Sequence, residues 1–133
     1  MTMSVTRTVQ RGSISAFVVC LVMAFLSLAG LVHDGGRIIA TYMQISDVAQ
    51  NAARLGGQQV VGIRDENPRV DVSTASKLIR NYVGTQSVRS DIQINGRRVS
   101  VTIEKNVRMN ILGLFGVSSR TVRVTRTAEV VDG

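Results

Sequence analysis

The first pattern along the chain is a run of 20 residues without a charged side chain, from Ser13 to Val32. A helix of that length spans about 30 Å, which matches the hydrocarbon core of a bilayer. Arg7 and Arg11 precede the run, and only Arg37 follows it closely. Because basic residues favour the cytoplasmic side of a membrane, the pattern predicts a transmembrane helix with its N-terminus in the cytoplasm.

Beyond this run, apolar residues recur at intervals of three and four, which predicts an amphipathic stalk helix over residues 33–62. Gly56 and Gly57 are expected to end or loosen the helix, and Gly62 is its latest stop. The recurring positions are Ile38, Tyr42, Ile45, Val48, Ala49, Ala52 and Leu55.

Five residues, 33–37, lie between the two patterns, and four of them are candidates for a membrane boundary or hinge: Asp34, Gly35, Gly36 and Arg37. Asp34 could cap a new helix; alternatively the helix is continuous, and the two glycines weaken it by up to ~1 kcal/mol each relative to alanine. Because the apolar stripe resumes without a loop-like stretch, we expect a continuous helix. Asp34 and Arg37 would then mark its exit from the membrane into water.

A charged segment with the only proline, residues 62–71, is typical of a linker. The next apolar spacing predicts a short helix that Asp71 or Ser73 caps and Gly84 closes. Its expected inner face is formed by Ala75, Leu78, Ile79, Tyr82 and Val83.

The remaining sequence alternates as β-strands do. Asn95-Gly96 predicts a two-residue hairpin loop, in which Ile94 would pair with Arg97 and Ile92 with Val99. A third strand alternates through Val122, Val124, Ala128 and Val130, with Arg126 as the exception. The apolar face of the hairpin would consist of Ile92, Ile94, Val99, Val101 and Ile103.

These elements predict an α+β fold: a long N-terminal transmembrane and stalk helix, a short helix and a three-stranded antiparallel sheet. Three strands with one apolar face need a cover, and the short helix and the stalk are available for it. We expect a cytoplasmic segment over 1–12, a transmembrane helix over 13–32, a stalk over 33–62 and a small extracytoplasmic head over 63–133.

The segment between the second and third strands, Ile111 to Val117, is an apolar loop or a single helical turn. Its side chains could plug one end of the sheet. Alternatively, they form an exposed apolar knob that touches the bilayer or a neighbouring subunit.

Cleavage as a signal peptide near Ala29 is the alternative to a permanent anchor. The apolar run is longer than the usual ~7 to 15 residues and lacks a clear A-x-A site, which favours the anchor. A lipoprotein is not favoured, because Cys20 lies in the middle of the run. One cysteine forms no internal disulfide, so packing must hold the head together.

Nothing in the sequence indicates an active site, a metal site or a cofactor. His33 is the only histidine, and the nine acidic residues are scattered along the chain. There is neither a phosphate-binding glycine loop nor a nucleophile elbow. The function classes that remain are those of binding and structural proteins, with a secreted enzyme released by signal cleavage as the distant alternative.

The C-terminal region is basic, with eight basic residues between Arg89 and Arg126 against Asp91 and Glu104. Such a surface could hold anionic lipid, an acidic partner or nucleic acid. Single-stranded nucleic acid is usually bound with stacking aromatics, and this region has only Phe115. A solvated basic face is therefore the simpler interpretation, and membrane-anchored nucleic-acid binding is the alternative function.

Four motifs in order carry a resemblance to a known family: "RGSISAF", an apolar helix, "GLVHDGGR" and "DVAQNAARLGGQ". Together with "VDVSTASKLIRNYV", the Asn-Gly hairpin and "ILGLFGVSSRTVRVTRTAEV", they resemble the TadE/TadG-like proteins of tight-adherence (Flp-type) pilus systems, especially the short actinobacterial forms. The resemblance covers nearly the whole chain and depends on the order and spacing of the motifs.

The resemblance implies a non-enzymatic, pilin-like protein of the cytoplasmic membrane that acts as a minor pilin or in pilus assembly, with other pilin-like proteins as partners. Some relatives are processed by a prepilin peptidase after a glycine, which corresponds to cleavage between Gly12 and Ser13 here. Their glutamate five residues beyond the glycine is replaced by Phe17. Phe17 cannot neutralise a neighbour's terminal amine, so a retained anchor is the competing expectation.

Two sets of residues are expected to mediate assembly into a homo- or hetero-oligomer. Small side chains in the apolar run would allow close approach of other membrane helices: Ser15, Ala16, Ser27, Ala29 and Gly30. Basic and apolar residues of the head would dock partners: Arg97, Arg98, Leu112, Leu114, Phe115, Arg120 and Arg123.

Overall fold

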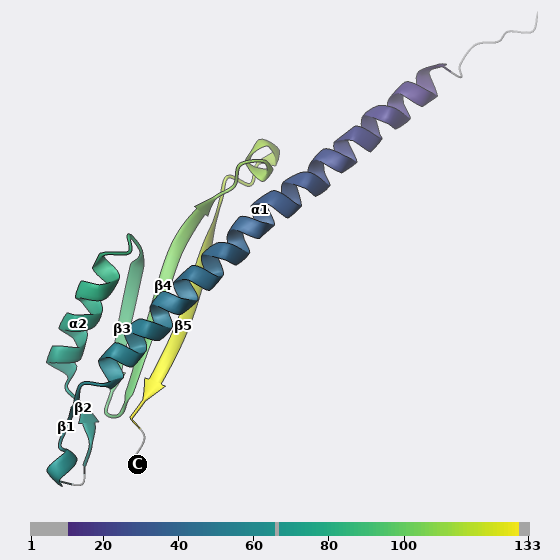
Figure 1. Ribbon diagram of the computed structural model, residues 1–133. Helices are drawn as coiled ribbons and strands as arrows, with labels where there is room; N and C mark the ends of the chain where they lie inside the picture. The colour runs from purple at the N-terminus through teal and green to yellow at the C-terminus, as the bar shows by residue number, and fades with distance from the viewer. Residues whose placement is uncertain (1–10, 66, 131–133) are drawn as a thin grey trace, which may run out of the picture.

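The computed structural model describes residues 11–65 and 67–130, and it has the predicted α+β fold. Arg7, on which the expected orientation partly depends, lies outside these residues. Figure 1 shows the sheet and the short helix gathered along the C-terminal half of the long helix, α1. The N-terminal half of α1 projects away from them as a free rod.

Helix α1 runs unbroken from Arg11 to Gly57, so the expectation of a continuous helix through Gly35 and Gly36 is confirmed. It contains the one segment of the described residues that is long and apolar enough to cross a membrane. The helix ends at Gly57, so the expectation that Gly56 and Gly57 end it is confirmed, and the stalk does not extend to its latest expected stop at Gly62.

The second half of α1 supplies much of the hydrophobic core. Its small and branched residues Ile45, Ala49 and Ala52 are at most 1% exposed. Alanine lets the sheet approach the helix backbone closely, and at Gly56 an added Cβ would lie 3.0 Å from Val99 Cγ1 of the sheet and 2.6 Å from Ile79 Cδ1 of the short helix. The second half of α1 and the head therefore share one core.

The short helix α2 spans Val72–Gly84 and begins as predicted, with Asp71 as its cap. The Asp71 carboxylate accepts hydrogen bonds from the backbone N–H groups of Ser73 and Thr74, at 3.1 and 3.4 Å. These satisfy N–H groups that have no partner within the helix. The inner face of α2 is buried at Ala75, Ile79 and Val83.

The main sheet has the order β3-β4-β5 and is antiparallel throughout. Its strands are β3 (Arg89–Asn95), β4 (Arg98–Arg108) and β5 (Ser119–Glu129). Helix α1 lies over β4 and β5, with α2 beside it toward β3. The expected covers of the sheet are thus confirmed.

The register of the hairpin differs from the prediction, although the apolar face is as expected. Ile94 pairs with Val99 and Asn95 with Arg98, so the loop is Gly96-Arg97 and not Asn95-Gly96. Only Gly96 has a positive φ, +57°, so a single glycine at the first turn position suffices, as in type II′ turns. This register places Ile94 opposite another apolar residue, and the two-residue shift in partner leaves each side chain on its expected face.

The segment expected to be a linker, residues 62–71, forms a small hairpin together with the two residues that precede it. Strand β1 (Val60–Val61) pairs with β2 (Arg69–Val70), with the 3-10 turn η1 (Ile63–Asp65) between them. Strands of two residues are too short to produce a hydrophobic alternation, so the sequence pattern did not reveal them.

The sheet has one apolar and one polar face. Its inner side chains Val99, Val101 and Ile103 are fully buried under the helices. The outer face carries paired hydroxyls, with Ser100 Oγ 2.9 Å from Thr127 Oγ1 and Thr102 Oγ1 2.8 Å from Thr125 Oγ1. The outer face is therefore suited to water, and the apolar surface available for binding lies elsewhere.

Candidate interaction surfaces on the long helix and the β4–β5 loop

The first candidate surface is a stripe of residues on α1 that is not covered by the head. Val32, Gly36, Ile39 and Met43 follow one another at intervals of four, three and four, which places them on one side of the helix. Val32, Ile39 and Met43 are 76, 58 and 62% exposed. A Cβ added at Gly36 would meet nothing within 4 Å. We call these four residues the outer stripe.

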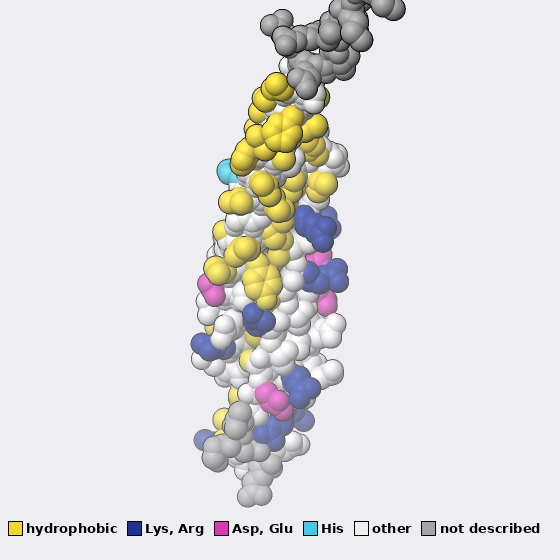
Figure 2. All heavy atoms as spheres, turned by 90° about the vertical axis from the view of Figure 1, so that its right-hand side faces the viewer, with side chains coloured by type: hydrophobic (Ala, Val, Ile, Leu, Met, Phe, Trp, Pro, Cys, Tyr) yellow, Lys and Arg dark blue, Asp and Glu magenta, His cyan; other side chains and the backbone are white. Residues whose placement is uncertain are grey.

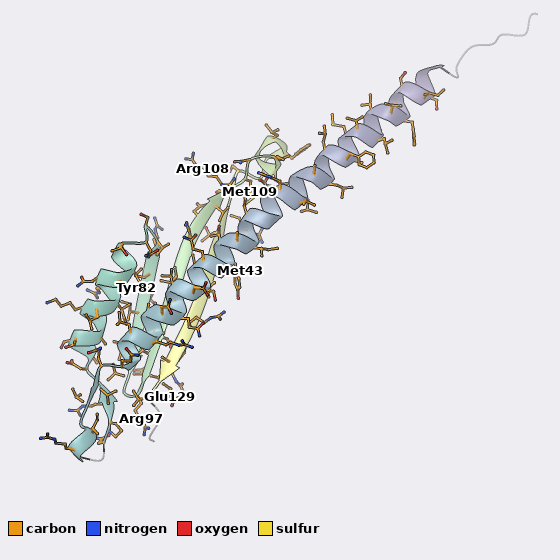
Figure 3. All side chains as sticks on the ribbon, viewed as in Figure 1. Met43, Tyr82, Arg97, Arg108, Met109 and Glu129 are labelled. Atoms are coloured by element: carbon orange, nitrogen blue, oxygen red, sulfur yellow. The ribbon has the colours of Figure 1, made fainter. Side chains whose placement is uncertain are left out.

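The outer stripe carries the apolar surface of α1 well past the end of the predicted span. Met43 lies 11 residues beyond Val32, about 16 Å along a helix. Figure 2 shows hydrophobic side chains continuing from the tip of the rod to the middle of the molecule. Met43 is labelled on α1 in Figure 3, beside the upper part of the sheet. An apolar surface of this extent on a small protein indicates a binding surface.

The second candidate surface is the loop between β4 and β5, which Asp34 holds against α1. Both carboxylate oxygens of Asp34 accept backbone hydrogen bonds: Oδ1 from Asn110 N at 3.0 Å, and Oδ2 from Ile111 N at 2.9 Å and Leu112 N at 2.7 Å. Asp34 is fully buried. We call this arrangement the Asp34 clamp.

The Asp34 clamp gives this residue a role that was not predicted. Because α1 is continuous, Asp34 caps no helix of its own. Its carboxylate instead accepts hydrogen bonds from the backbone N–H of Ile111, which precedes the 3-10 turn η2 (Leu112–Phe115), and from that of Leu112, the first residue of the turn. Nearby, Arg37 Nη1 donates a hydrogen bond to the carbonyl oxygen of Arg108, at 3.2 Å, which ties the same loop to α1 a second time.

Gly30 also belongs to this contact. A Cβ on Gly30 would lie 2.5 Å from Ile111 Cγ2, so only glycine lets the loop approach the helix this closely. Gly30 therefore packs against the β4–β5 loop of its own chain, a contact that was not predicted. The other four small residues predicted to pack, Ser15, Ala16, Ser27 and Ala29, are exposed on the rod.

The loop plugs the sheet and forms a knob at the same time. Ile111 packs on Gly30, and Leu112 packs against the core. Leu114 and Phe115 point away and are 84 and 56% exposed. Gly116 closes the turn with φ of +94°, a conformation that favours glycine. We call Leu114 and Phe115 the apolar knob.

Hydrogen bonds lower the pKa of Asp34 below its ordinary value. The amide of Leu112 contributes most, burial opposes it, and the amides of Asn110 and Ile111 and the nearby His33 lower the pKa further. A carboxyl with a lowered pKa stabilises the folded state above its ordinary pKa and loses that effect as the pH falls through the lowered value. The clamp is therefore intact at neutral pH.

Replacing Asp34 by asparagine is expected to release the loop from α1. One of the two acceptor oxygens becomes an NH₂ donor that faces backbone N–H groups. Hydrogen exchange at the amides of Asn110, Ile111 and Leu112 should rise by roughly tenfold to a hundredfold, as expected for the loss of a hydrogen bond to a charged acceptor. Amide exchange measured residue by residue on the full chain in detergent tests this.

The control is Asp47→Asn, which removes an exposed carboxylate from the same helix. It should leave exchange in the loop unchanged. In the unaltered chain, the intrinsic-rate-corrected protection of these amides should stay constant between about pH 5 and pH 8, because aspartate ionises near ~3.9. Protection that vanishes near neutral pH would contradict the clamp.

The predicted basic docking residues do not form one surface. Arg97 and Arg98 lie at the hairpin end of the sheet, whereas Arg120 lies at the other end, next to the knob. Several basic groups have partners: Arg98 pairs with Glu129 at 3.3 Å, Arg123 pairs with Glu104, and Arg97 donates to the Val130 carbonyl. On the inner face, Lys105 binds Gln44 and Arg126 binds Ser46. This dispersal gives no support to a nucleic-acid groove.

The described residues contain no group of three or more potential metal-ligating side chains. His33 is exposed on the rod side of the clamp. The hollow lined by Gln50, Arg54, Arg126 and Glu129 is open to solvent between α1 and β5. None of these features brings a nucleophile, a base and an oxyanion donor together.

Neither the outer stripe nor the Asp34 clamp is predicted by the sequence pattern. The predicted apolar stripe of α1 includes Ile45 and Ala49, which lie on the buried side of the helix. Ile39 and Met43 lie at helical spacing from Val32, but α1 carries apolar residues on several sides, so the sequence alone does not show which side the head leaves free. No local signal identifies the partner of Asp34, since the loop lies 76 residues further along the chain.

The arrangement is suited to binding along the helix and at the knob. No protein-family model matches the chain, and comparison with curated proteins and with solved structures found no significant match.

Proposed function

We propose that this protein is a non-enzymatic, single-pass membrane subunit that acts as a minor pilin or assembly scaffold of a Tad/Flp-type pilus or a related envelope machine. Its N-terminus would lie in the cytoplasm and its head outside the cytoplasmic membrane. One observation carries the proposal: a single unbroken helix is an exposed apolar rod over its first half and the spine of a small head over its second.

The exposed rod supports membrane insertion. Large side chains such as Phe17, Phe25 and Leu28 are 58–66% exposed, and nothing in the head covers them. Full burial of one large apolar side chain contributes roughly 1.5–3 kcal/mol, so a bilayer stabilises this rod strongly relative to water. Because the same helix continues into the core, the head would be coupled rigidly to the membrane segment.

The outer stripe supports assembly. Ile39 and Met43 lie beyond the span, where a bilayer no longer covers them. A parallel helix of a second subunit would bury them, and Gly36 would let its backbone come close. The resemblance to TadE/TadG-like proteins agrees with such packing, because pilin-like subunits assemble through other pilin-like proteins.

Processing between Gly12 and Ser13 remains part of the proposal as an alternative to a retained anchor. Phe17 is 66% exposed, which suits lipid or an apolar neighbour. It offers no carboxylate to a terminal amine. N-terminal sequencing of the native protein distinguishes the two, with Ser13 as the first residue after processing. A start beyond Ala29 would remove the anchor and contradict the proposed function.

Cross-linking through the outer stripe tests assembly directly. In a Cys20→Ser background, Ile39→Cys is expected to give a disulfide-linked dimer when native membranes are treated with an oxidant, because each chain then carries a single thiol. A disulfide requires Cα atoms within about 7 Å, so the reaction reports close packing. The products are measured by non-reducing electrophoresis and identified by mass spectrometry.

The matched control is Lys77→Cys on α2, an exposed site away from the stripe, in the same background. It should remain largely monomeric under the same oxidation. Equal cross-linking at both positions would indicate random collision, and no cross-linking at Ile39→Cys would count against assembly through this face.

A further inference from the structure

The apolar knob lies at the level of the last turn of the proposed span. Ile111, three residues before Leu114, touches Gly30, and Gly30 belongs to the uncharged run that ends at Val32. In Figure 1 the β4–β5 loop reaches further along α1 toward the rod than any other part of the head. If the rod crosses a bilayer, the knob must therefore meet the lipid surface.

The knob is apolar where the rest of this end of the head is polar. Leu114 and Phe115 are exposed, and the strand residues of the outer face nearest the loop are polar or charged: Asn106, Arg108, Ser119 and Thr121. Outside α1, one further exposed apolar side chain of the described head, Val117, adjoins the knob in the same loop. The others, Val61, Ile63 and Val72, belong to the β1–β2 hairpin and the start of α2, at the opposite end in Figure 1. The knob is therefore the apolar feature of the head that adjoins the rod.

The charges that flank the knob fit a lipid surface. The segments 33–37, 105–110 and 118–121 contain one acid, Asp34, which is buried in the clamp. Their exposed arginines are Arg37, Arg108 and Arg120. Figure 3 shows Arg108 and Met109 at the loop end of β4, beside α1. Cations next to an apolar wedge are suited to the phosphates of lipid headgroups.

The Asp34 clamp lowers the free-energy cost of placing the β4–β5 loop at the membrane surface. Near the hydrocarbon boundary, backbone N–H groups and a carboxylate without partners are costly because water is scarce. In the clamp the carboxylate of Asp34 accepts hydrogen bonds from three backbone N–H groups of the loop, at 2.7–3.0 Å, so both kinds of polar group have partners. The loop can therefore enter the headgroup region without leaving these polar groups unpaired.

We propose that Leu114 and Phe115 form a second membrane contact, inserting into the lipid leaflet from which α1 emerges, with Arg37, Arg108 and Arg120 at the headgroups. This inference rests on the membrane span of the proposed function. A single helix can rotate about its own axis in a bilayer; a second contact fixes that rotation. The outer stripe is thereby held in one orientation relative to the membrane, ready for lateral packing.

The absence of tryptophan from the sequence allows a direct test. Phe115→Trp introduces a single fluorophore at an exposed site. The full chain is reconstituted into vesicles of phosphatidylcholine and phosphatidylglycerol, with or without bromine on the acyl chains. The proposal predicts that brominated lipid quenches most of the emission of Phe115→Trp.

Two further single-tryptophan variants make the outcome specific. Phe25→Trp lies in the rod and should be quenched if the span is correct. Ile63→Trp lies at the far end of the head, 70% exposed in the unaltered chain, and should not be quenched. Quenching at positions 25 and 115 but not at 63 supports the proposal.

The outcomes distinguish failure of the membrane span from failure of the second membrane contact. If Phe25→Trp is quenched and Phe115→Trp behaves like Ile63→Trp, the span is correct and the second membrane contact is wrong. Emission of Phe115→Trp that shifts to shorter wavelength without quenching would assign the knob to a protein neighbour and would also overturn the proposal. If Phe25→Trp escapes quenching, the span itself fails.

Discussion

Replacing Ile103 by alanine is expected to destabilise the head by roughly 2–5 kcal/mol, the range measured for truncation of a buried aliphatic side chain. Ile103 is fully buried at the centre of β4, under α1. No disulfide is available to offset the loss, because the chain has one cysteine. Since small domains are stable by only about 5–15 kcal/mol, this single change removes a large share of the total.

The matched control is Ile63→Ala, the same chemical change at a side chain that is 70% exposed. It should alter the free energy of unfolding by less than about 0.5 kcal/mol. Both variants are compared as the full chain in mild detergent, with the urea midpoint measured by protease sensitivity of the head. Equal midpoints for the two variants would mean that the head is not held by the β4 core.

Sequence patterns predicted the elements of this fold because each pattern is local. Twenty uncharged residues give a long apolar helix, and Asp71 caps α2 through hydrogen bonds to residues two and three positions away. The alternation in β4 and β5 placed Val101, Ile103 and Val124 on one face, where all are buried. Side-chain periodicity and local capping are both encoded within a few residues.

The features that were missed or wrong depend on contacts between distant segments. Gly30 looked like a residue for helix packing in the membrane, but its partner is Ile111 of the same chain. Asp34 looked like a boundary residue, and its partners are three amides in the β4–β5 loop. In the hairpin, two neighbouring registers satisfy the same alternation, and the turn conformation at Gly96 selects between them.

Of the candidate surfaces, the knob could be predicted from sequence and the outer stripe could not. Leu114 and Phe115 stand out as apolar residues in a loop. Ile39 and Met43 do not, because a helix with apolar residues on several sides gives no sign of which side the head will cover. Only the position of the sheet against Ile45 and Ala49 identifies the opposite side as free.

Introducing a charge into the outer stripe, Met43→Glu, is expected to abolish assembly while leaving the single chain folded. Met43 is 62% exposed, so the substitution should change the stability of the isolated chain by less than about 0.5 kcal/mol. In a helix–helix interface the same carboxylate would be buried without a partner. A penalty of roughly 3–5 kcal/mol weakens association by about a hundredfold or more.

The measurement is disulfide formation through Ile39→Cys in native membranes, with and without Met43→Glu, in the Cys20→Ser background. Asn81→Asp is the control, because it adds a charge at an exposed position of α2, away from the stripe. It should leave cross-linking intact. Undiminished cross-linking with Met43→Glu would show that the stripe is not the assembly surface.

Gly36→Ala is expected to stabilise the single chain and, at the same time, to weaken its assembly. A Cβ at position 36 has no neighbour within 4 Å in the single chain, and alanine favours a helix by up to ~1 kcal/mol over glycine. The variant should therefore unfold at higher urea than the unaltered chain. If a second helix packs closely over Gly36, the added methyl group separates the two backbones and cross-linking falls. A stabilised chain that assembles less well distinguishes lost packing from lost folding, which a destabilising substitution cannot do.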